Sequence, residues 1–178
     1  MIEEGITSIG NEAFSEMNEV DQIELPSTLT SIGSNAFESC SSLKTVKIPE
    51  KVEKIGQAVF FKCSSLESII VNGHNEQYQT IDGVLMTKDG KRIVHCPTKL
   101  EKKEYVIPDG VEVIGKGAFT ENTIELIVFP DTLKIIGDSA SMEVRTLFRL
   151  FFHSIWKISE RNLLYNVNSL TMSQSFQK

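Results

Sequence analysis

The residues best suited to nucleophilic, redox or metal chemistry are three cysteines and three histidines: Cys40, Cys63, Cys96, His74, His95 and His153. Only His95 and Cys96 are neighbours. A thiol-dependent hydrolase or a redox enzyme would use such a pair, because a nearby base or cation activates a cysteine nucleophile. Cys96 lies in a segment with the pattern of a hairpin, however, and there we expect a structural role for it.

Metal binding is not indicated by the spacing of these side chains. Structural zinc sites use closely spaced ligand pairs such as Cys-x-x-Cys, and the sequence has none. Cys40 and Cys63 lie 23 residues apart at equivalent positions, so we expect them to be buried free thiols in neighbouring units. His74, near Glu76 in a polar loop, lacks a second ligand cluster. The sequence therefore predicts no metal and no other cofactor.

Familiar catalytic motifs are also missing. Neither His-Glu-x-x-His nor Gly-x-Ser-x-Gly occurs, and Gly115-Lys116-Gly117 has Thr120 where a dinucleotide-binding loop would have its third glycine. The sequence thus predicts a non-catalytic protein. A thiol-dependent enzyme that uses His95 and Cys96 is the less favoured alternative.

A repeated motif organises the chain around these residues. The dipeptide Ile-Gly occurs five times, followed at a fixed distance by Ala or Val and, in four copies, by Phe. The intervals between successive strand landmarks are 23, 23, 23, 36 and 22 residues. These landmarks are Ile2, Leu25, Ile48, Val71, Ile107 and Phe129. Such a period falls in the range of leucine-rich repeats, about 20–29 residues.

One repeat shows the expected local structure. Val46 and Ile48 alternate with Lys47 as in a half-buried strand, and Pro49 ends the strand because it cannot donate to a sheet. Gly56 is expected to adopt a conformation closed to residues with side chains, so that the backbone can bend. The Ala–Phe pair is expected on a short helical turn, with the phenylalanine between coils. Stacked coils would then share one core in a solenoid with a parallel sheet along one face.

The full pattern is Leu-x-x-Ile-x-Ile-Pro-x-x-Val-x-x-Ile-Gly-x-x-Ala-Phe-x-x-Cys-Ser-Ser-Leu, and it resembles the BspA-like leucine-rich-repeat family. Residues 37–66 carry it most clearly, with Cys40-Ser41-Ser42-Leu43 and Cys63-Ser64-Ser65-Leu66 as its end. The resemblance covers residues 1 to about 140. It implies an α/β leucine-rich-repeat solenoid, mainly β, with a cell-surface or secreted location and an adhesin-like or surface-antigen role. The implied partner is a protein, such as a host or extracellular-matrix protein.

The long interval between Val71 and Ile107 holds 13 additional residues. Asp82-Gly83 between two apolar segments predicts a hairpin. The hairpin either spaces or caps the coils, or it protrudes as a loop that contacts a partner.

These features predict a solenoid over residues 1–137 and a divergent tail over 138–178. The solenoid has regular repeats over 1–71, a long repeat with the hairpin over 72–107, and repeats over 108–137. The tail contains six of the fourteen aromatic residues and departs from the motif after Ala140. It is a terminal cap or a gene-model artefact, and an amphipathic helix over Glu143 to Ile158 is another interpretation. A truncated repeat fragment without independent function remains an alternative.

Composition and charge limit the class of protein and the kind of partner. The 178 residues are 40% hydrophobic and 24% charged with a net charge of −6, which indicates a folded chain and argues against a nucleic-acid binder. The first residues lack the basic and apolar regions of a signal peptide, and no apolar run reaches the ~18 residues of a membrane-spanning helix. Taken alone, these features predict a cytosolic chain without a membrane span.

The outward side of the strands is the most informative surface. Parallel strands lie ~4.8 Å apart, so the outward residues of successive strands are expected to form one contiguous stripe that becomes apolar along the chain. This stripe is either a protein-contact patch or the ordinary preference of strands for β-branched residues. The candidate protein-binding residues are Glu24, Lys47, Ile70, Val106, Leu126 and Val128.

Overall fold

The computed structural model describes residues 2–140 and 147–149, and their regular elements are short strands. Six strands precede the long repeat: β1 (Ser8–Ile9), β2 (Gln22–Ile23), β3 (Ser31–Ile32), β4 (Thr45–Ile48), β5 (Lys54–Ile55) and β6 (Ser68–Val71). The long repeat contains β7 (Tyr78–Ile81), β8 (Val84–Thr87), β9 (Arg92–His95) and β10 (Glu104–Val106). The last strands are β11 (Val113–Ile114), β12 (Leu126–Val128), β13 (Ile135–Ile136) and β14 (Leu147–Arg149).

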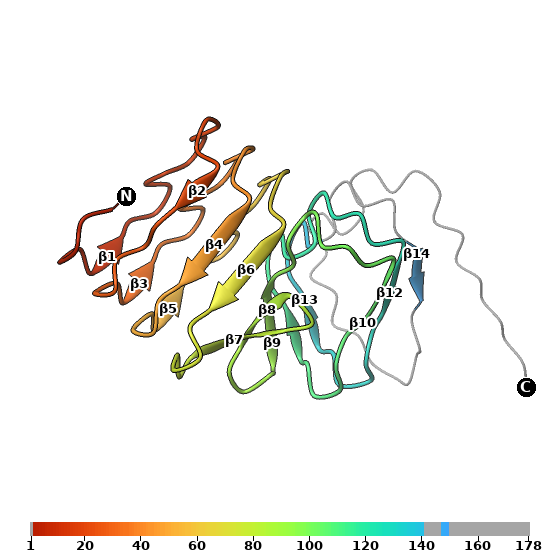
Figure 1. Cartoon of the computed structure of the whole chain (residues 1–178). Coiled ribbons are helices and arrows are strands. Elements are labelled where there is room, and N and C mark those ends of the chain that lie inside the picture. Colours follow the sequence, from red (N-terminus) through yellow and green to blue (C-terminus); the bar gives the residue numbers. More distant parts are fainter. Residues whose placement is uncertain (1, 141–146, 150–178) are drawn as a thin grey trace, which may run out of the picture.

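The strands stack coil upon coil into a solenoid with two strand-bearing faces (Figure 1). Before the long repeat, β2, β4 and β6 form a parallel sheet on one face, and β1, β3 and β5 form a parallel sheet on the other. The partners Val46 and Ile69, like Ile32 and Ile55, lie 23 residues apart. The 23-residue coil inferred from the sequence is therefore confirmed as the structural unit, although it carries strands on two faces and not on one.

The expected short helical turns are wrong: no helix occurs in the described residues, so this part of the chain is all-β and not α/β. The Ala–Phe segments form turns in which phenylalanine amides bond to the neighbouring coil. Phe14 N donates to Ala36 O at 2.9 Å, and Phe37 N donates to Val59 O at 3.0 Å. Residues with positive φ, such as Asn35 at 56°, recur in these turns and interrupt any right-handed helix.

The expectation for Gly56 is also wrong, because its φ is not positive. The glycine is required instead by the close approach of coils: a Cβ on Gly56 would lie 2.6 Å from the carbonyl carbon of Gly33. Gly33 and Gly137 face the preceding coil in the same way. The positive φ falls two residues after Gly56, at Ala58.

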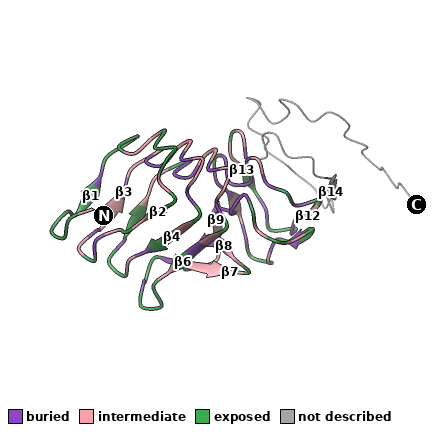
Figure 2. Cartoon of the chain, turned by 45° about the horizontal axis from the view of Figure 1, so that its top comes forward, coloured by how far each residue is buried: buried purple, intermediate pink, exposed green. Residues whose placement is uncertain are grey.

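The core runs along the inside of the coils. Phe14 stacks on Phe37 with ring centroids 5.6 Å apart, and Phe37 stacks on Phe60 at 5.7 Å. The expected place of phenylalanine between coils is thus confirmed. His95 continues this ladder, since its ring lies edge-on to Phe60 at 5.7 Å. Figure 2 shows buried residues gathered around β8 and β9 and more exposed ones on the first coils.

The long repeat forms the predicted hairpin. β7 and β8 pair antiparallel with Ile81 opposite Val84, and the two turn residues, Asp82 and Gly83, have φ of 53° and 85°. Positive φ at both positions is typical of a type I′ turn. β8 pairs with β9, and β9 joins β11 and β13 in one sheet.

The hairpin does not protrude, because its side chains fill the junction between the two halves of the solenoid. Leu85 packs into the first core cluster, and its neighbour Met86 packs into the second. The turn itself is tied to the segment that follows the hairpin, since Lys102 Nζ lies 3.2 Å from Asp82 Oδ1. Of the two interpretations of this segment, the structure favours a spacer between coils.

The described part of the tail continues the sheet, because β14 pairs in parallel with β12. A continuous helix over Glu143 to Ile158 is therefore wrong. The remaining interpretations of residues 138–178, a cap or a gene-model artefact, concern a segment that lies largely outside the described residues.

Candidate protein-binding surface

His95 and Cys96 do not form a catalytic pair in this structure. They are consecutive residues at the end of β9, and their side chains lie in different parts of the core: the His95 ring packs on Phe60, whereas Cys96 belongs to the second core cluster. Only 1% of the surface of His95 is exposed, and burial lowers its pKa to about 3. Burial raises the pKa of the Cys96 thiol, which disfavours the reactive thiolate.

The cysteines of the regular coils are buried, as predicted. The Sγ of Cys40 donates to Phe14 O and that of Cys63 donates to Phe37 O, each at 3.1 Å. All three cysteines of the chain are free thiols. Burial raises the pKa of both Cys40 and Cys63. These side chains fill space and satisfy a carbonyl of the neighbouring coil.

The described residues contain no group of three or more metal-ligating side chains that could hold a metal ion. His74 lies in an exposed turn. His153 lies outside the described residues.

The six candidate binding residues do not form one stripe. Lys47 pairs with Ile70 in the sheet of β2, β4 and β6, and Glu24 directly follows β2. Val106 pairs with Val128 in the sheet of β10, β12 and β14. β6 and β10 are edge strands of these separate sheets. The prediction of a contiguous stripe is therefore wrong, because the long repeat separates the two sheets.

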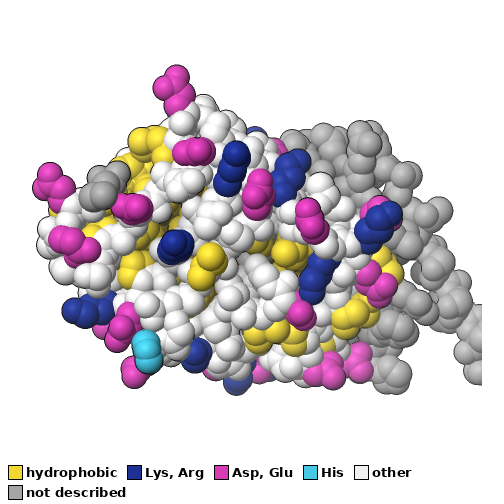
Figure 3. All heavy atoms as spheres, in the orientation of Figure 1, with side chains coloured by type: hydrophobic (Ala, Val, Ile, Leu, Met, Phe, Trp, Pro, Cys, Tyr) yellow, Lys and Arg dark blue, Asp and Glu magenta, His cyan; other side chains and the backbone are white. Residues whose placement is uncertain are grey.

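The outward side of β10 and β12 carries the denser apolar group. Val106 is 59% exposed and lies beside half-buried Val128, while Leu126 lies on the same side of β12. Ile70 on β6 is 49% exposed, and its neighbour is the charged Lys47. Figure 3 shows hydrophobic side chains among charged ones on one face of the molecule. Val106, Leu126 and Val128 are hereafter called the β10–β12 patch.

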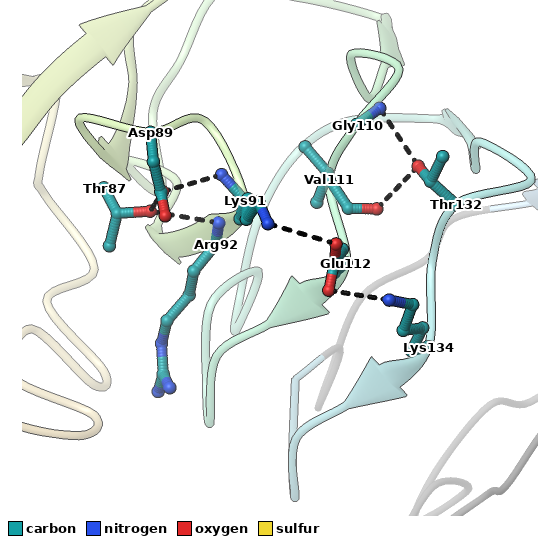
Figure 4. Close-up of polar contacts among 9 residues, drawn as sticks. All are labelled: Thr87, Asp89, Lys91, Arg92, Gly110, Val111, Glu112, Thr132 and Lys134. Atoms are coloured by element: carbon teal, nitrogen blue, oxygen red, sulfur yellow. Dashed lines mark hydrogen bonds and ion pairs between the residues drawn. The ribbon is translucent and has the colours of Figure 1, made fainter.

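The other strand face is held by polar contacts between coils (Figure 4). Glu112 accepts a hydrogen bond from Lys134 Nζ at 2.9 Å and lies 3.6 Å from Lys91 Nζ, so the charges alternate from coil to coil. The Lys134 hydrogen bond is the main reason that the pKa of Glu112 is lowered. Thr132 Oγ1 accepts from Gly110 N and adds a further link between coils. Lys103 and Glu125, just before β10 and β12, form a similar ion pair with Nζ and Oε1 3.5 Å apart, so ion pairs between coils accompany both strand faces.

Sequence reasoning missed two buried asparagines that hold the long repeat in place. Asn75 Nδ2 donates to three carbonyl oxygens of the preceding coil, and Asn75 Oδ1 accepts from two amides of its own segment. Asn122 Nδ2 donates to Pro97 O at 2.8 Å and to Cys96 Sγ at 3.2 Å.

The sequence held a signal for one of these asparagines only. Asn122 follows the isoleucine of its Ile-Gly pair by 8 residues, the spacing at which earlier coils carry Cys40 and Cys63. An alignment of the repeats therefore shows a polar amide at a position where the first three coils carry Met17, Cys40 and Cys63. Asn75 lies in the long repeat after the motif has ended, so no repeat position marks it.

Comparison with known proteins agrees with this architecture. The family model described as the BspA type leucine rich repeat region matches residues 1–83 and 96–178 in six copies. The unmatched residues, 84–95, are those of β8, β9 and their connecting turn. No curated protein matches the sequence.

Solved structures include similar solenoids. A leucine-rich cell surface protein from Faecalibacterium prausnitzii is 30% identical with a TM-score of 0.78, over 85% of this chain and 40% of that one. The pneumococcal vaccine antigen PcpA is 25% identical with a TM-score of 0.73, over 81% of this chain and 38% of that one. A leucine-rich repeat protein from Eubacterium ventriosum is 18% identical with a TM-score of 0.53, over 88% of this chain and 59% of that one, and shows the fold alone.

The chain spans less than half the length of the first two of these structures. Among the described residues, no helix is long and apolar enough to span a membrane. The repeat period, the stacked phenylalanines, the glycines at the coil contacts and the matching family model agree with one another. The chain belongs to the BspA-type leucine-rich repeat family.

Proposed function

We propose that this chain is a non-catalytic protein-binding module with an adhesin-like or surface-antigen-like role. The observation that carries the proposal is the β10–β12 patch, in which Val106 is 59% exposed beside Val128 and Leu126. Exposed apolar residues on neighbouring rigid strands are typical of protein interfaces. The names of two similar solved proteins, a cell surface protein and a vaccine antigen, support a location on the cell surface or outside the cell. A host or extracellular-matrix protein is the proposed partner.

The proposal assigns binding to two separate areas. The main area is the β10–β12 patch, and the second is formed by Lys47 and Ile70 with Glu24 at the end of β2. Each area lies on paired strands, so its side chains are held at fixed spacing before a partner arrives. Such preorganisation reduces the entropy cost of binding.

The test is binding of the purified chain to host cells and to a panel of extracellular-matrix proteins. Val106→Asp combined with Val128→Asp should reduce binding by about tenfold or more, because a charge buried without a partner is costly at an interface. Ile135→Asp is the matched control: Ile135 is 51% exposed on β13, which belongs to the other strand face. Circular dichroism must show that each variant is folded. Equal binding by the wild type and the folded double variant would reject the β10–β12 patch.

Two other functions compete with this proposal. A thiol-dependent enzyme would need His95 and Cys96 to reach a substrate, and both are buried. A truncated repeat fragment without independent function would bind none of the tested proteins, and the double variant would then behave like the wild type in every assay.

A further inference from the structure

The turn between β6 and β7 holds an Asn-Gly dipeptide, Asn72-Gly73, and these two residues are exposed together with His74. The backbone fixes the turn at both ends, since Asn72 N donates to Ile48 O at 3.0 Å and Asn75 N donates to Asn72 O at 2.9 Å. Within the turn, the side-chain oxygen Oδ1 of Asn72 accepts a hydrogen bond from His74 N at 2.9 Å. This bond holds the carboxamide of Asn72 close to the backbone of the next residue.

The geometry suits an intramolecular reaction. The deprotonated amide nitrogen of Gly73 can attack Cγ of Asn72, and the C–N bond to the side-chain amide then breaks and releases ammonia. Water opens the resulting succinimide to aspartate or isoaspartate. Negative charge develops on Oδ1 during the attack, and the His74 N–H donates to that oxygen, as a donor of an oxyanion hole does. Gly73 has no Cβ, and the space around it is open, so water and base can reach its amide.

Two other asparagines provide an internal comparison. Asn75 Oδ1 accepts from Gln77 N at 2.9 Å and Asn122 Oδ1 accepts from Ile124 N at 2.8 Å, the same local pattern as at Asn72. Both side chains are buried, and both use their amide nitrogens in hydrogen bonds to other segments. The residues that follow them are not glycine. Among these three asparagines, only Asn72 combines the hydrogen bond with exposure and a glycine neighbour.

Asp89-Gly90, in the turn between β8 and β9, has a similar arrangement, because Asp89 Oδ1 accepts from Lys91 N at 3.0 Å. The hydrogen bond from the Thr87 hydroxyl is the main cause of the lowered pKa of Asp89. A carboxylate resists attack by an amide nitrogen, whereas the neutral carboxamide of Asn72 does not. The two turns therefore differ in reactivity in spite of their similar geometry.

We propose that Asn72 is a self-modifying residue, which deamidates in the folded protein to aspartate and isoaspartate. The product adds a negative charge just after β6, close in sequence to exposed Ile70. Isoaspartate also inserts an additional methylene into the backbone of the turn. That turn positions Asn75, whose side chain bonds carbonyl groups of the preceding coil. Deamidation thus alters both the charge near β6 and the fit of the long repeat.

The full chain is incubated at neutral and mildly alkaline pH, and its tryptic peptides are analysed by mass spectrometry with an isoaspartate assay. One tryptic peptide, residues 63–88, contains both Asn72 and Asn75, so fragment ions compare the two sites within one molecule. Asn72 should convert to an aspartate and isoaspartate pair while Asn75 and Asn122 persist. Equal conversion of Asn72 and Asn75 in the folded protein would overturn the proposal.

Substitutions of the two neighbours separate their roles. Gly73→Ala introduces a Cβ that meets nothing within 4 Å, so the fold tolerates it, but the Cβ hinders attack on Asn72 and should slow conversion. His74→Pro removes the N–H that bonds Oδ1 and should slow conversion by about tenfold. This decrease in rate is smaller than that caused by removing a donor from the buried oxyanion hole of an enzyme, because Asn72 is exposed to water. His74→Ala keeps this N–H, so it is the matched control and should convert like the wild type.

Conversion of the wild type in urea supplies the reference for the folded state. If folded Asn72 converts more than about tenfold slower than unfolded Asn72, the turn protects the residue and the inference is refuted. A rate in the folded chain that equals or exceeds the rate in urea, and that falls in His74→Pro but not in His74→Ala, supports it.

Discussion

Replacement of the repeat glycine is the most direct test of how the coils pack. Gly56→Ala adds a single methyl group at a backbone position whose φ is compatible with alanine. The new Cβ would lie 2.6 Å from the carbonyl carbon of Gly33, 0.8 Å short of the 3.4 Å at which ordinary van der Waals contact begins. The atoms in the way belong to the backbone, so rotation of a side chain cannot relieve the contact. The two coils must move apart.

The cost follows from the hydrogen bonds that such a movement stretches. Gly56 N donates to Ile32 O at 2.8 Å, and Asn35 N donates to Gln57 O at 3.0 Å, both between the coils that must separate. A displacement of ~0.8 Å lengthens these bonds beyond hydrogen-bonding distance, at about 1 kcal/mol each. Overpacking adds about 1–3 kcal/mol. The free energy of unfolding should therefore fall by about 3–5 kcal/mol.

Gly10→Ala is the matched control, since Gly10 occupies the same repeat position in the first coil and a Cβ there meets nothing within 4 Å. It should change stability by less than about 0.5 kcal/mol or stabilise slightly, because alanine reduces the entropy of the unfolded chain. Urea unfolding followed by circular dichroism measures both variants. If Gly56→Ala is within about 1 kcal/mol of Gly10→Ala, the close approach of the coils does not explain the repeated glycine.

Three further predictions concern buried polar and sulfur groups. His95→Phe should stabilise the protein by about 1 kcal/mol near neutral pH, because both ring nitrogens of His95 are buried without a hydrogen-bond partner in the described structure. Burial lowers the pKa of His95 to about 3, below its unfolded value of about 6.5, so the unfolded chain binds more protons between these two pH values. The free energy of unfolding of the wild type should therefore fall as the pH falls through this window. Urea unfolding of His95→Phe at the same pH values should lack this part of the pH dependence. Asn75→Ala should lower the free energy of unfolding, measured in urea, by about 3 kcal/mol because its side-chain hydrogen bonds are lost. Asn72→Ala, at an exposed site, should lower it by less than about 1 kcal/mol. Equal decreases would contradict the assigned role of Asn75. All three cysteines should react slowly with a thiol reagent in the native state and rapidly in urea, and fast native labelling of Cys96 would restore the enzyme alternative.

The strands of the regular coils could be predicted from sequence because local pattern and burial agree there. The spacing of Leu43, Val46 and Ile48 marks an inward-facing set, and all three side chains are buried. The conformation of the Ala–Phe segments could not be predicted in the same way. The amides of Phe14 and Phe37 bond to the next coil, and a pattern within one repeat does not specify a partner in another.

The cause of the repeated glycine could not be read from the sequence either. The recurrence of Gly33 and Gly56 is visible there, but a missing side chain serves a positive φ and a close backbone approach equally well. Only the stacking of coils distinguishes these two causes. The positive φ belongs to Asn35 and Ala58, whose residue types differ from one coil to the next.

The long repeat explains why the buried core could be predicted from the sequence whereas the arrangement of the outward-facing residues could not. Asp82-Gly83 predicts the hairpin from local residue types, but the partner of β9 is set by distant pairing, in which Ile93 lies opposite Ile114. This pairing places three strands of the long repeat, β7, β8 and β9, in the sheet of β11 and β13. On the other face β6 and β10 are left as sheet edges.

The two halves of the solenoid therefore have separate core clusters that meet at the hairpin, and their outward strands belong to separate sheets. The contact of Phe60 with His95 carries the aromatic ladder into the long repeat, while Ile70 and Val106 lie on different sheets. Residues without a shared sheet or contact act independently, so substitutions at Ile70 and at Val106 should have additive effects on a partner that touches both. A partner that fits only the β10–β12 patch would be insensitive to Ile70. Because β6 and β10 belong to separate sheets, a binding partner can contact the two areas of this face independently of each other.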